Sequence, residues 1–371
     1  MATITPDPID AATPPDGELV LNVPIEIRAL KARVNALAGI PADTANYYRR
    51  NLLDNSAFQI IQRRNNILNN VSAVYTTARV FFYDRWALAF SAGVTATVAA
   101  ITASEVASPS KRKYGVNVTS AITPQAVTIT QRIRTARIFE GKTLVLSGLI
   151  DVPAAVLAAG AVSVSVSLNY GTGGTPATQA LLASLTITAS GVQTFELEVD
   201  VPNSVDLSDY GTDSNEYLFV QLYYFVVQNQ PVYVGYMQLE EGAAASPYEM
   251  RTIQEERERC EYHFQTSYGT GFSIGQVTES GKERFQANTA VTAVEGGVRF
   301  RRTMVAVPSV ILYSPATANT FNSVRNETAA AEVGSSVAAN VSTQGFSNVT
   351  LGSSAVADNF YSFHWIADAE L

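Results

Sequence analysis

A chain of 371 residues is long enough for two or three domains and for a core that needs no disulfide bonds. Charged residues make up 16% of it, below the usual share of roughly 25%, and the net charge is −8. Because no cluster of Lys and Arg offsets this charge, the composition excludes nucleic-acid binding through phosphate contacts. The single cysteine, Cys260, excludes an internal disulfide framework, and we expect a buried structural thiol.

The N-terminal segment begins with an extended peptide. Its prolines remove backbone donors and favour polyproline-like geometry, which leaves two interpretations open: a disordered tail, or a peptide that docks into a larger assembly. It has neither the basic region nor the apolar region of a secretory signal. The prolines are Pro6, Pro8, Pro14 and Pro15.

A short helix with the 4-3-4-3 apolar spacing of a coiled coil follows this peptide. With proline-rich and loop-like neighbours on both sides, self-association is favoured over packing on the helix's own domain. The β-branched residues at a with Leu at d indicate a dimer by the coiled-coil rules, but the seam is too short to decide the number of chains. We therefore predict that residues 1–46 attach and oligomerise the chain. The predicted oligomerisation residues are Val23, Ile27, Leu30, Val34 and Leu37.

Residues 47–250 read as short strands separated by turns. The segments alternate in polarity or are β-branched, and no helix lies between them, so the pattern predicts an antiparallel β-sandwich of jelly-roll type. Leu218 to Val227 is apolar on both faces, which is typical of a central strand. The uncharged stretch from Trp86 to Ser104 is interrupted by Ser and Thr and predicts strands, not a membrane helix. The other predicted strands are 116–119, 126–130, 144–146, 162–168, 185–188 and 195–199.

A charged linker helix is predicted over 251–268. Thr252–Glu255 forms a capping-box pattern at its start, and Glu255–Arg259 and Arg257–Glu261 have the spacing of helical ion pairs. Ile253, Cys260 and Phe264 are predicted to dock between the two β bodies. Residues 269–371 then form a second β module, with firm strands at 307–313 and 361–366.

Residue chemistry does not predict an active site. Cys260 and His263 are one helical turn apart, but without an orienting third group this pair predicts packing. Glu240 and Glu241 are neighbours on a strand and point to opposite faces, so they cannot flank one glycosidic bond. The Asp206–Glu216 loop has enough oxygens for calcium, but its spacing fits no EF-hand, and a solvated turn is the default. We therefore expect no enzyme activity, no cofactor and no metal.

Several motifs, in order along the chain, resemble segments of bacteriophage tail-fibre and virion fibre or spike proteins. The opening of the jelly roll in that family has a shorter link between QR and DRW and a glycine at the position of Arg64, so the loop from Arg64 to Phe82 departs from its pattern. The matching segments are EIRALK at 26–31, NLLDN at 51–55, FQI at 58–60, QR at 62–63, DRW at 84–86, YGTGG at 170–174, QLEEG at 238–242 and ADAEL at 367–371.

The resemblance implies a mainly β protein with a carbohydrate-binding-like jelly roll, a linker helix and a C-terminal β-sandwich. It implies a non-enzymatic virion protein, a tail-fibre adhesin subunit that attaches to other virion proteins through residues 1–40 and presents its β modules to host surface polysaccharide. It favours a trimer, while a dimer remains open; no nucleic-acid partner and no membrane insertion are expected. The alternatives are a head or neck spike or decoration protein with a purely structural role, and a depolymerase-type glycosidase.

Sugar binding relies on exposed aromatic faces that stack on C–H groups, with amides and carboxylates that hold the hydroxyls. The sequence offers four candidates for these platforms, although aromatic residues more often belong to the core. The candidate glycan contacts are Tyr75, Tyr114, Tyr210 and Trp365.

Overall fold

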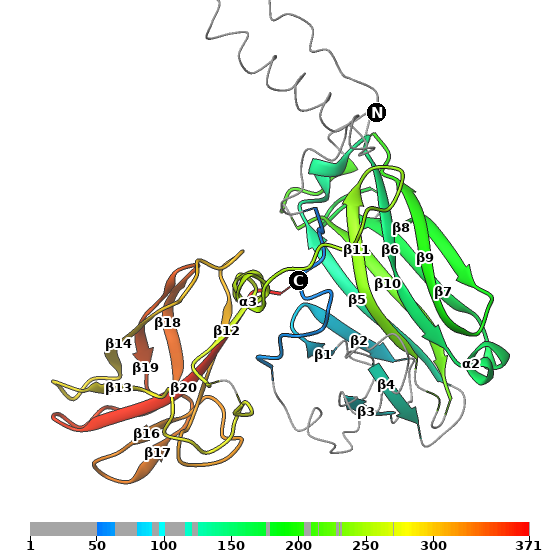
Figure 1. The fold of residues 1–371 in the computed structure, drawn as a ribbon. Helices are drawn as coiled ribbons and strands as arrows, with labels where there is room; N and C mark the ends of the chain where they lie inside the picture. Colours follow the sequence, from blue (N-terminus) through cyan, green and yellow to red (C-terminus); the bar gives the residue numbers. More distant parts are fainter. Residues whose placement is uncertain are drawn as a thin grey trace, which may run out of the picture. The chain divides into compact units, whose positions relative to one another are not determined.

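The computed structural model describes residues 50–63, 80–90, 96–100, 116–120, 125–175, 179–203, 209–213, 215–227, 230, 232–269 and 271–370. The predicted oligomerisation residues, from Val23 to Leu37, lie outside them. The described part is mainly β, and its strand pairs are antiparallel, as the sequence predicts (Figure 1). Its elements belong to the unit that begins at Asn51. No helix in the described ranges combines the length and the apolar character that crossing a bilayer requires.

Two antiparallel sheets form the first β body. A six-stranded sheet in the order β1-β2-β5-β10-β7-β8 and a three-stranded sheet in the order β11-β6-β9 share one hydrophobic core (Figure 1). A separate hairpin joins β3 to β4. The strands are β1 Val80–Tyr83, β2 Trp86–Phe90, β3 Ala96–Ala100, β4 Val116–Ser120, β5 Gln125–Arg134, β6 Thr143–Val152, β7 Val162–Asn169, β8 Ala180–Ile187, β9 Gly191–Asp200, β10 Tyr217–Val226 and β11 Tyr233–Glu241; the short helices are η3 Ala136–Phe139 and α2 Ala154–Ala159.

A second β body follows, built around the last strand. That strand, β20, pairs with β12, β13, β15 and β16, and a three-stranded sheet β14-β19-β18 closes a second hydrophobic core. The predicted strand at 307–313 begins only at Ser309, because Pro308 has no N–H for a ladder bond. The strands are β12 Phe264–Thr266, β13 Glu283–Gln286, β14 Ala293–Arg299, β15 Ser309–Tyr313, β16 Val324–Asn326, β17 Ala331–Val333, β18 Val337–Ser342, β19 Gly345–Thr350 and β20 Phe360–Asp368.

The predicted linker helix is the shorter α3, Ile253–Glu261, followed by β12. Its capping box is confirmed: Glu255 N–H donates to Thr252 Oγ1 (3.2 Å), and Thr252 N–H donates to Glu255 Oε2 (2.8 Å). Cys260 and Phe264 are buried as predicted, but Ile253 is 58% exposed, so its predicted docking is wrong. The first-turn position of Ile253 lies on the side of α3 that faces solvent.

The charged residues of α3 pair mainly outside the helix. Arg259 Nε lies 2.5 Å from Asp54 Oδ1, and Arg301 Nη1 lies 3.3 Å from Glu261 Oε1. The spacing rule for helical ion pairs therefore misassigned these two side chains, because each has a partner from another segment, Asp54 for Arg259 and Arg301 for Glu261.

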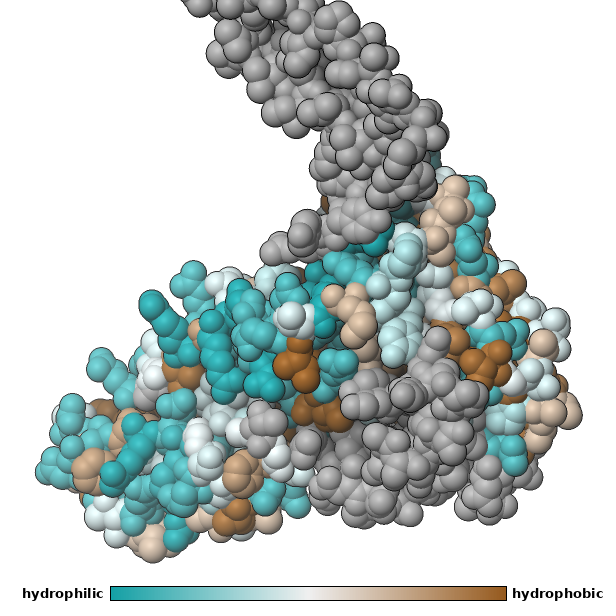
Figure 2. All heavy atoms as spheres, viewed as in Figure 1, coloured by the Kyte–Doolittle hydropathy of each residue, from teal (hydrophilic) through white to brown (hydrophobic). Residues whose placement is uncertain are grey.

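Exposed apolar residues are scattered over the described surface. On the side shown in Figure 2, hydrophobic residues form only small, separate patches among hydrophilic ones. Single exposed apolar side chains of this kind need no partner.

Candidate functional site

The central strand β10 presents a row of aromatic side chains on the face opposite the core. Leu218, Val220, Leu222, Tyr224 and Val226 point into the core and are at most 1% exposed. The alternate residues are half-buried on the outer face, and Gln221 lies in their middle. We call the four rings the aromatic row: Tyr217, Phe219, Tyr223 and Phe225.

The rings of the aromatic row contact one another in two pairs. The Tyr217 and Phe219 centroids are 6.2 Å apart, and the Tyr223 and Phe225 centroids are 5.7 Å apart, both edge to face. The close approach of Phe225 requires glycine at 160, since a Cβ there would lie 2.4 Å from its ring. The pairs therefore sit in fixed positions on a strand hydrogen-bonded on both sides.

Small hydroxyl residues flank the aromatic row. In the antiparallel register, Gln221 lies opposite Ser165 on β7 and Thr130 on β5, and Tyr223 lies opposite Ser163 and Thr128. Cross-strand partners project to the same face. Thr130 is 2% exposed and its hydroxyl donates to Ala87 O (3.5 Å), so the half-buried hydroxyls beside Gln221 and Tyr223 are those of Ser165, Ser163 and Thr128.

One end of the row carries cationic and amide groups. Phe219 lies opposite Arg132, whose guanidinium carbon is 4.6 Å from the Tyr217 ring centroid and 5.9 Å from that of Phe219. Gln179 Nε2 donates to the Tyr217 hydroxyl at 3.3 Å. Rings for stacking thus stand beside donors for hydroxyl or anionic groups, which is the combination that sugar recognition needs.

The predicted aromatic contacts lie elsewhere. Tyr210 is 5% exposed and Trp365 is 3% exposed, so neither offers a free face, and the prediction is wrong for both. Tyr210 packs under the Arg137 guanidinium (4.8 Å), and Trp365 packs against Phe300 in the second core (5.4 Å). Tyr75 and Tyr114 lie outside the described residues.

The Asp206–Glu216 loop is described only in part. Glu216 is 3% exposed and pairs with Arg137 (3.4 Å), and Asn215 Oδ1 accepts from Thr172 N–H (2.9 Å). No group of three or more His, Cys, Asp or Glu side chains suited to a metal ion occurs within the described ranges. Residues 204–208 and 214 lie outside the described ranges, so the expectation of a solvated turn stays a prediction.

A second feature, the polar joint, links the two β bodies through buried charges. Arg85 Nε lies 3.0 Å from Asp54 Oδ2, and the same guanidinium pairs with Glu370. Arg63 Nη1 lies 2.6 Å from Asp368 Oδ2. We define the polar joint as Asp54, Arg63, Arg85, Arg259, Asp368 and Glu370.

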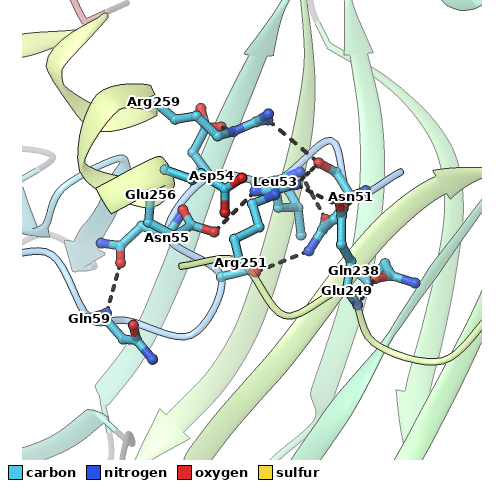
Figure 3. Close-up of polar contacts among 12 residues, drawn as sticks. Asn51, Leu53, Asp54, Asn55, Gln59, Gln238, Glu249, Arg251, Glu256 and Arg259 are labelled. Carbon is cyan, nitrogen blue, oxygen red and sulfur yellow. Dashed lines mark hydrogen bonds and ion pairs between the residues drawn. The ribbon is translucent and has the colours of Figure 1, made fainter. Parts of the chain in front are cut away.

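The chain segment that carries Asp54 is held by amide side chains. Asn51 Nδ2 donates to Met237 O (2.9 Å), while its Oδ1 accepts from Leu239 N–H (3.2 Å), so one side chain extends the ladder of β11. Asn55 Nδ2 donates to Asp84 O (2.9 Å), and Asn55 N–H donates to Glu256 Oε2 (2.6 Å). These contacts fix the segment between β11 and α3 (Figure 3).

Arg251 completes this arrangement ahead of α3. Its guanidinium donates to Leu53 O (2.9 Å) and to Asn51 O, and it pairs with Glu256 (3.1 Å) and Glu249 (3.3 Å) (Figure 3). Its side chain is 5% exposed. Arg251 therefore binds the backbone of the jelly-roll segment and the helix together.

Burial and charge shift several pKa values in the joint. Burial alone would raise the pKa of Asp54, but Arg259, Arg85 and His263 outweigh it and lower the pKa to about 2. Burial raises the pKa of Asp84 to about 6, against the opposing effects of Arg63 and the Gln62 hydrogen bonds. Burial, aided by Arg85, lowers the pKa of His263 well below its usual value. At neutral pH Asp54 is therefore ionised and His263 is neutral.

The cysteine and histidine candidates are buried. Cys260 is 0% exposed, and burial raises the pKa of its thiol well above the usual value. His263 Nε2 lies 3.8 Å from Asp54 Oδ2 and Nδ1 lies 3.9 Å from Glu370 Oε2, so its ring packs within the joint. Ser267 Oγ and His364 Nδ1 form a second pair at 3.0 Å. The sequence does not predict it, because 97 residues separate the two.

That serine–histidine pair is shut away from solvent. His364 is 0% exposed, its Nε2 lies 2.9 Å from Thr278 O, and its ring stacks on Tyr268 (4.2 Å). Ser267 Oγ accepts from Trp365 N–H at 2.9 Å. A nucleophile must be accessible to its substrate, and this pair is buried. Its contacts connect β20 to neighbouring segments.

Comparisons with known proteins complete this description. No family model and no curated protein matches the chain. The enzymatically active domain of bacteriophage CBA120 tailspike protein 4 matches 48% of this chain, but only 21% of its own length, at 10% identity and a TM-score of 0.29.

Two smaller proteins match over most of their own length. A putative sugar binding protein from Bacteroides thetaiotaomicron is covered fully, with 52% of this chain, 12% identity and a TM-score of 0.31. The C-terminal family 22 carbohydrate binding module of a Clostridium thermocellum protein is covered over 89%, with 44% of this chain, 15% identity and a TM-score of 0.28. At such identities and TM-scores these likenesses carry no argument about function.

Proposed function

We propose that this chain is a non-enzymatic subunit of a phage virion appendage, a tail-fibre adhesin that binds host surface polysaccharide through the aromatic row. The motif resemblance motivates the virion assignment. The observation that carries the binding is the placement of Tyr217, Phe219, Tyr223 and Phe225 on one outer sheet face around Gln221.

The chemistry of this face suits sugars. A sugar ring has faces of C–H groups that stack on aromatic rings, and hydroxyls that need donors and acceptors. The row supplies the rings, and Gln221 with the Ser and Thr neighbours supplies hydrogen-bonding groups. The rings are already paired edge to face, and Phe225 approaches the backbone at Gly160 closely. A ligand therefore need not order them on binding.

Weak binding at each site is sufficient in an oligomer. In this proposal residues 1–40 attach to other virion proteins, and the predicted helix joins copies, with a trimer favoured over a dimer. Several equivalent faces on one appendage would then bind one polysaccharide chain or surface together, which raises avidity without a new contact. The proposed location is the particle surface.

The test is glycan binding by the full chain under multivalent display. Purified capsular and O-antigen polysaccharides from a bacterial panel are immobilised, and binding of wild type is compared with Tyr223→Ala and Phe219→Ala. Phe321→Ala, which removes a 65% exposed ring from the second body, is the matched control. Loss of binding in the first two variants, with unchanged thermal melting, supports the proposal; equal binding of all proteins contradicts it.

A second candidate is a spike or decoration protein of the head or neck with a purely structural role. The polar joint favours it, because buried ion pairs between Arg63, Arg85 and the C-terminal residues fix the two β bodies to one another. Particles that lack this protein separate the two candidates. Loss of particle stability without the protein, together with no glycan binding by wild type, favours the structural role.

A further inference from the structure

We propose that the glycan bound by the aromatic row is anionic, and that Arg132 binds its negative group beside Tyr217 and Phe219. This inference rests on the proposed function and specifies the chemical class of the ligand. Three observations carry it. Arg132 has no hydrogen-bond or ion-pair partner among the described residues, the same sheet face is locally positive, and amide groups lie at that end of the row.

Arg132 differs from the other half-buried or buried arginines of the first β body. Arg63, Arg85 and Arg137 each pair with a carboxylate. Arg134 donates to Ala369 O at 2.7 Å. In the part of the chain that the structure describes, the Arg132 side chain makes no hydrogen bond and no ion pair, and its Nε is buried without an acceptor. A buried N–H without an acceptor is costly, and an anion bound by the guanidinium would offer one.

The Arg132 guanidinium is nevertheless held in place. It lies over the Tyr217 and Phe219 rings at 4.6 and 5.9 Å. Its backbone carbonyl accepts from Arg85 Nη2 at 2.5 Å, which ties this part of β5 to the polar joint. Pre-positioned guanidinium groups bind carboxylates and phosphates through a planar fork of N–H donors.

The charges around Arg132 favour an anion. The outer-face positions of β5, β10 and β7 that face one another in register comprise only one other charge, Arg134; the rest are aromatic, hydroxyl, amide or alanine side chains. The whole chain carries a net charge of −8. The two guanidinium groups make this end of the face locally positive, which attracts a negatively charged ligand against the repulsion of the net negative chain.

Neutral polar groups at the same end suit the remainder of a sugar. Asn169 lies opposite Tyr217 on β7, and Gln179 Nε2 donates to the Tyr217 hydroxyl. An anionic sugar placed here would stack on Tyr217 or Phe219, give its negative group to Arg132 and its hydroxyls to the amides. A uronic-acid carboxylate and a phosphate substituent share this chemistry.

The experiment compares native polysaccharides with chemically neutralised ones. Each polymer of the panel is prepared in native, carboxyl-reduced and dephosphorylated form. Binding to wild type, Arg132→Gln and Tyr223→Ala is measured, with Arg299→Gln, an exposed arginine of β14, as matched control. We expect wild type and Arg299→Gln to bind the native anionic polymer, and Arg132→Gln to lose at least about tenfold in affinity, as for a hydrogen bond to a charged group.

The outcomes separate this inference from the proposed function. Carboxyl reduction or dephosphorylation should weaken wild type as much as Arg132→Gln weakens the native interaction, and whichever treatment does so identifies the anion. Equal affinity of wild type for native and neutral forms, or unchanged binding by Arg132→Gln, overturns the inference while Tyr223→Ala still tests the aromatic row. Absence of binding to every polymer overturns both.

Discussion

Arg85 and Glu370, 285 residues apart in the chain, form an ion pair in which each side chain is only 4% exposed. Arg85 comes from the turn between β1 and β2, and Glu370 follows the last strand of the second β body. The same guanidinium binds Asp54, so one cation serves carboxylates from both bodies. The polar joint therefore couples the ends of the described chain.

Replacement of Arg85 by alanine should destabilise the fold strongly. Asp54 and Glu370 would remain buried without their shared cation, and breaking a buried pair from one side costs about 3–5 kcal/mol. Urea denaturation monitored by tryptophan fluorescence measures the loss. Arg299→Ala, at an exposed position, should change stability by less than about 0.5 kcal/mol.

The double variant Arg85→Met/Glu370→Leu separates the charge effect from packing. Removing both charges relieves the desolvation cost, so this protein should recover part of the stability lost in Arg85→Ala. Stability of the double variant below that of the single one would contradict this account of the joint.

Asp84→Asn should be more stable than wild type at neutral pH. The pKa of Asp84 is raised from 3.8 to about 6, so the folded protein retains a proton that the unfolded chain releases as the pH rises through this window. Stability therefore falls between about pH 4 and pH 6, and at pH 7 the ionised group costs up to about 3 kcal/mol.

The asparagine side chain avoids this cost and still accepts from the Gln62 N–H with one oxygen. Urea midpoints for both proteins at pH 4 and pH 7 check the prediction. The lowered pKa of His263 acts in the opposite sense, since stability falls as the pH drops below about 6.5, but it is common to both proteins and cancels in the difference. A variant equally destabilised at both pH values would contradict the prediction.

The sequence predicts the strands and the cap of α3 because these depend on local pattern. The aromatic row was missed for a physical reason. Apart from Gln221, both sets of alternating residues on β10 are aliphatic or aromatic, so periodicity alone does not say which set faces the core. The Ser–Val alternation of β7 shows that its serines lie on the outer face. The register between β7 and β10 then shows that the β10 residues opposite those serines lie on the outer face too. Register between distant strands is not encoded in either strand alone.

Local sequence patterns do not predict the contacts of the polar joint either. Its ion pairs join segments that are far apart in the chain, for example Arg63 and Asp368, which are 305 positions apart. The motifs that carry the family resemblance, NLLDN, QR, DRW and ADAEL, supply five of its six side chains, so the resemblance marked the residues without showing their contacts. Arg259 was assigned to a neighbour on its own helix because that pairing is visible in the sequence.

Thr252→Ala should lower stability by about 1 kcal/mol through loss of the cap of α3. The backbone N–H of Glu255 would lose its acceptor in the protein and would bind water. Thermal melting measures the change, and Thr252→Ser, which keeps the hydroxyl, should remain within a few tenths of a kcal/mol of wild type. An alanine variant as stable as the serine variant would show that the cap contributes little.

Cys260 should resist thiol reagents in the native protein. The residue is fully buried and its thiol pKa is raised, so the reactive thiolate is scarce and inaccessible. Ellman's reagent should react with wild type only after denaturation. Under native conditions it should react faster with Arg85→Ala than with wild type, because that variant unfolds transiently more often. Rapid reaction of native wild type would contradict the burial of Cys260.

Binding of the full chain, displayed multivalently, to purified bacterial surface polysaccharides before and after replacement of the aromatic row tests whether this sheet face holds a glycan. Wild type and Phe321→Ala should bind at least one polymer, and a Phe219→Ala/Tyr223→Ala protein with unchanged melting should bind none. Equal binding by the row variant and wild type would contradict the claim that this sheet face holds the glycan.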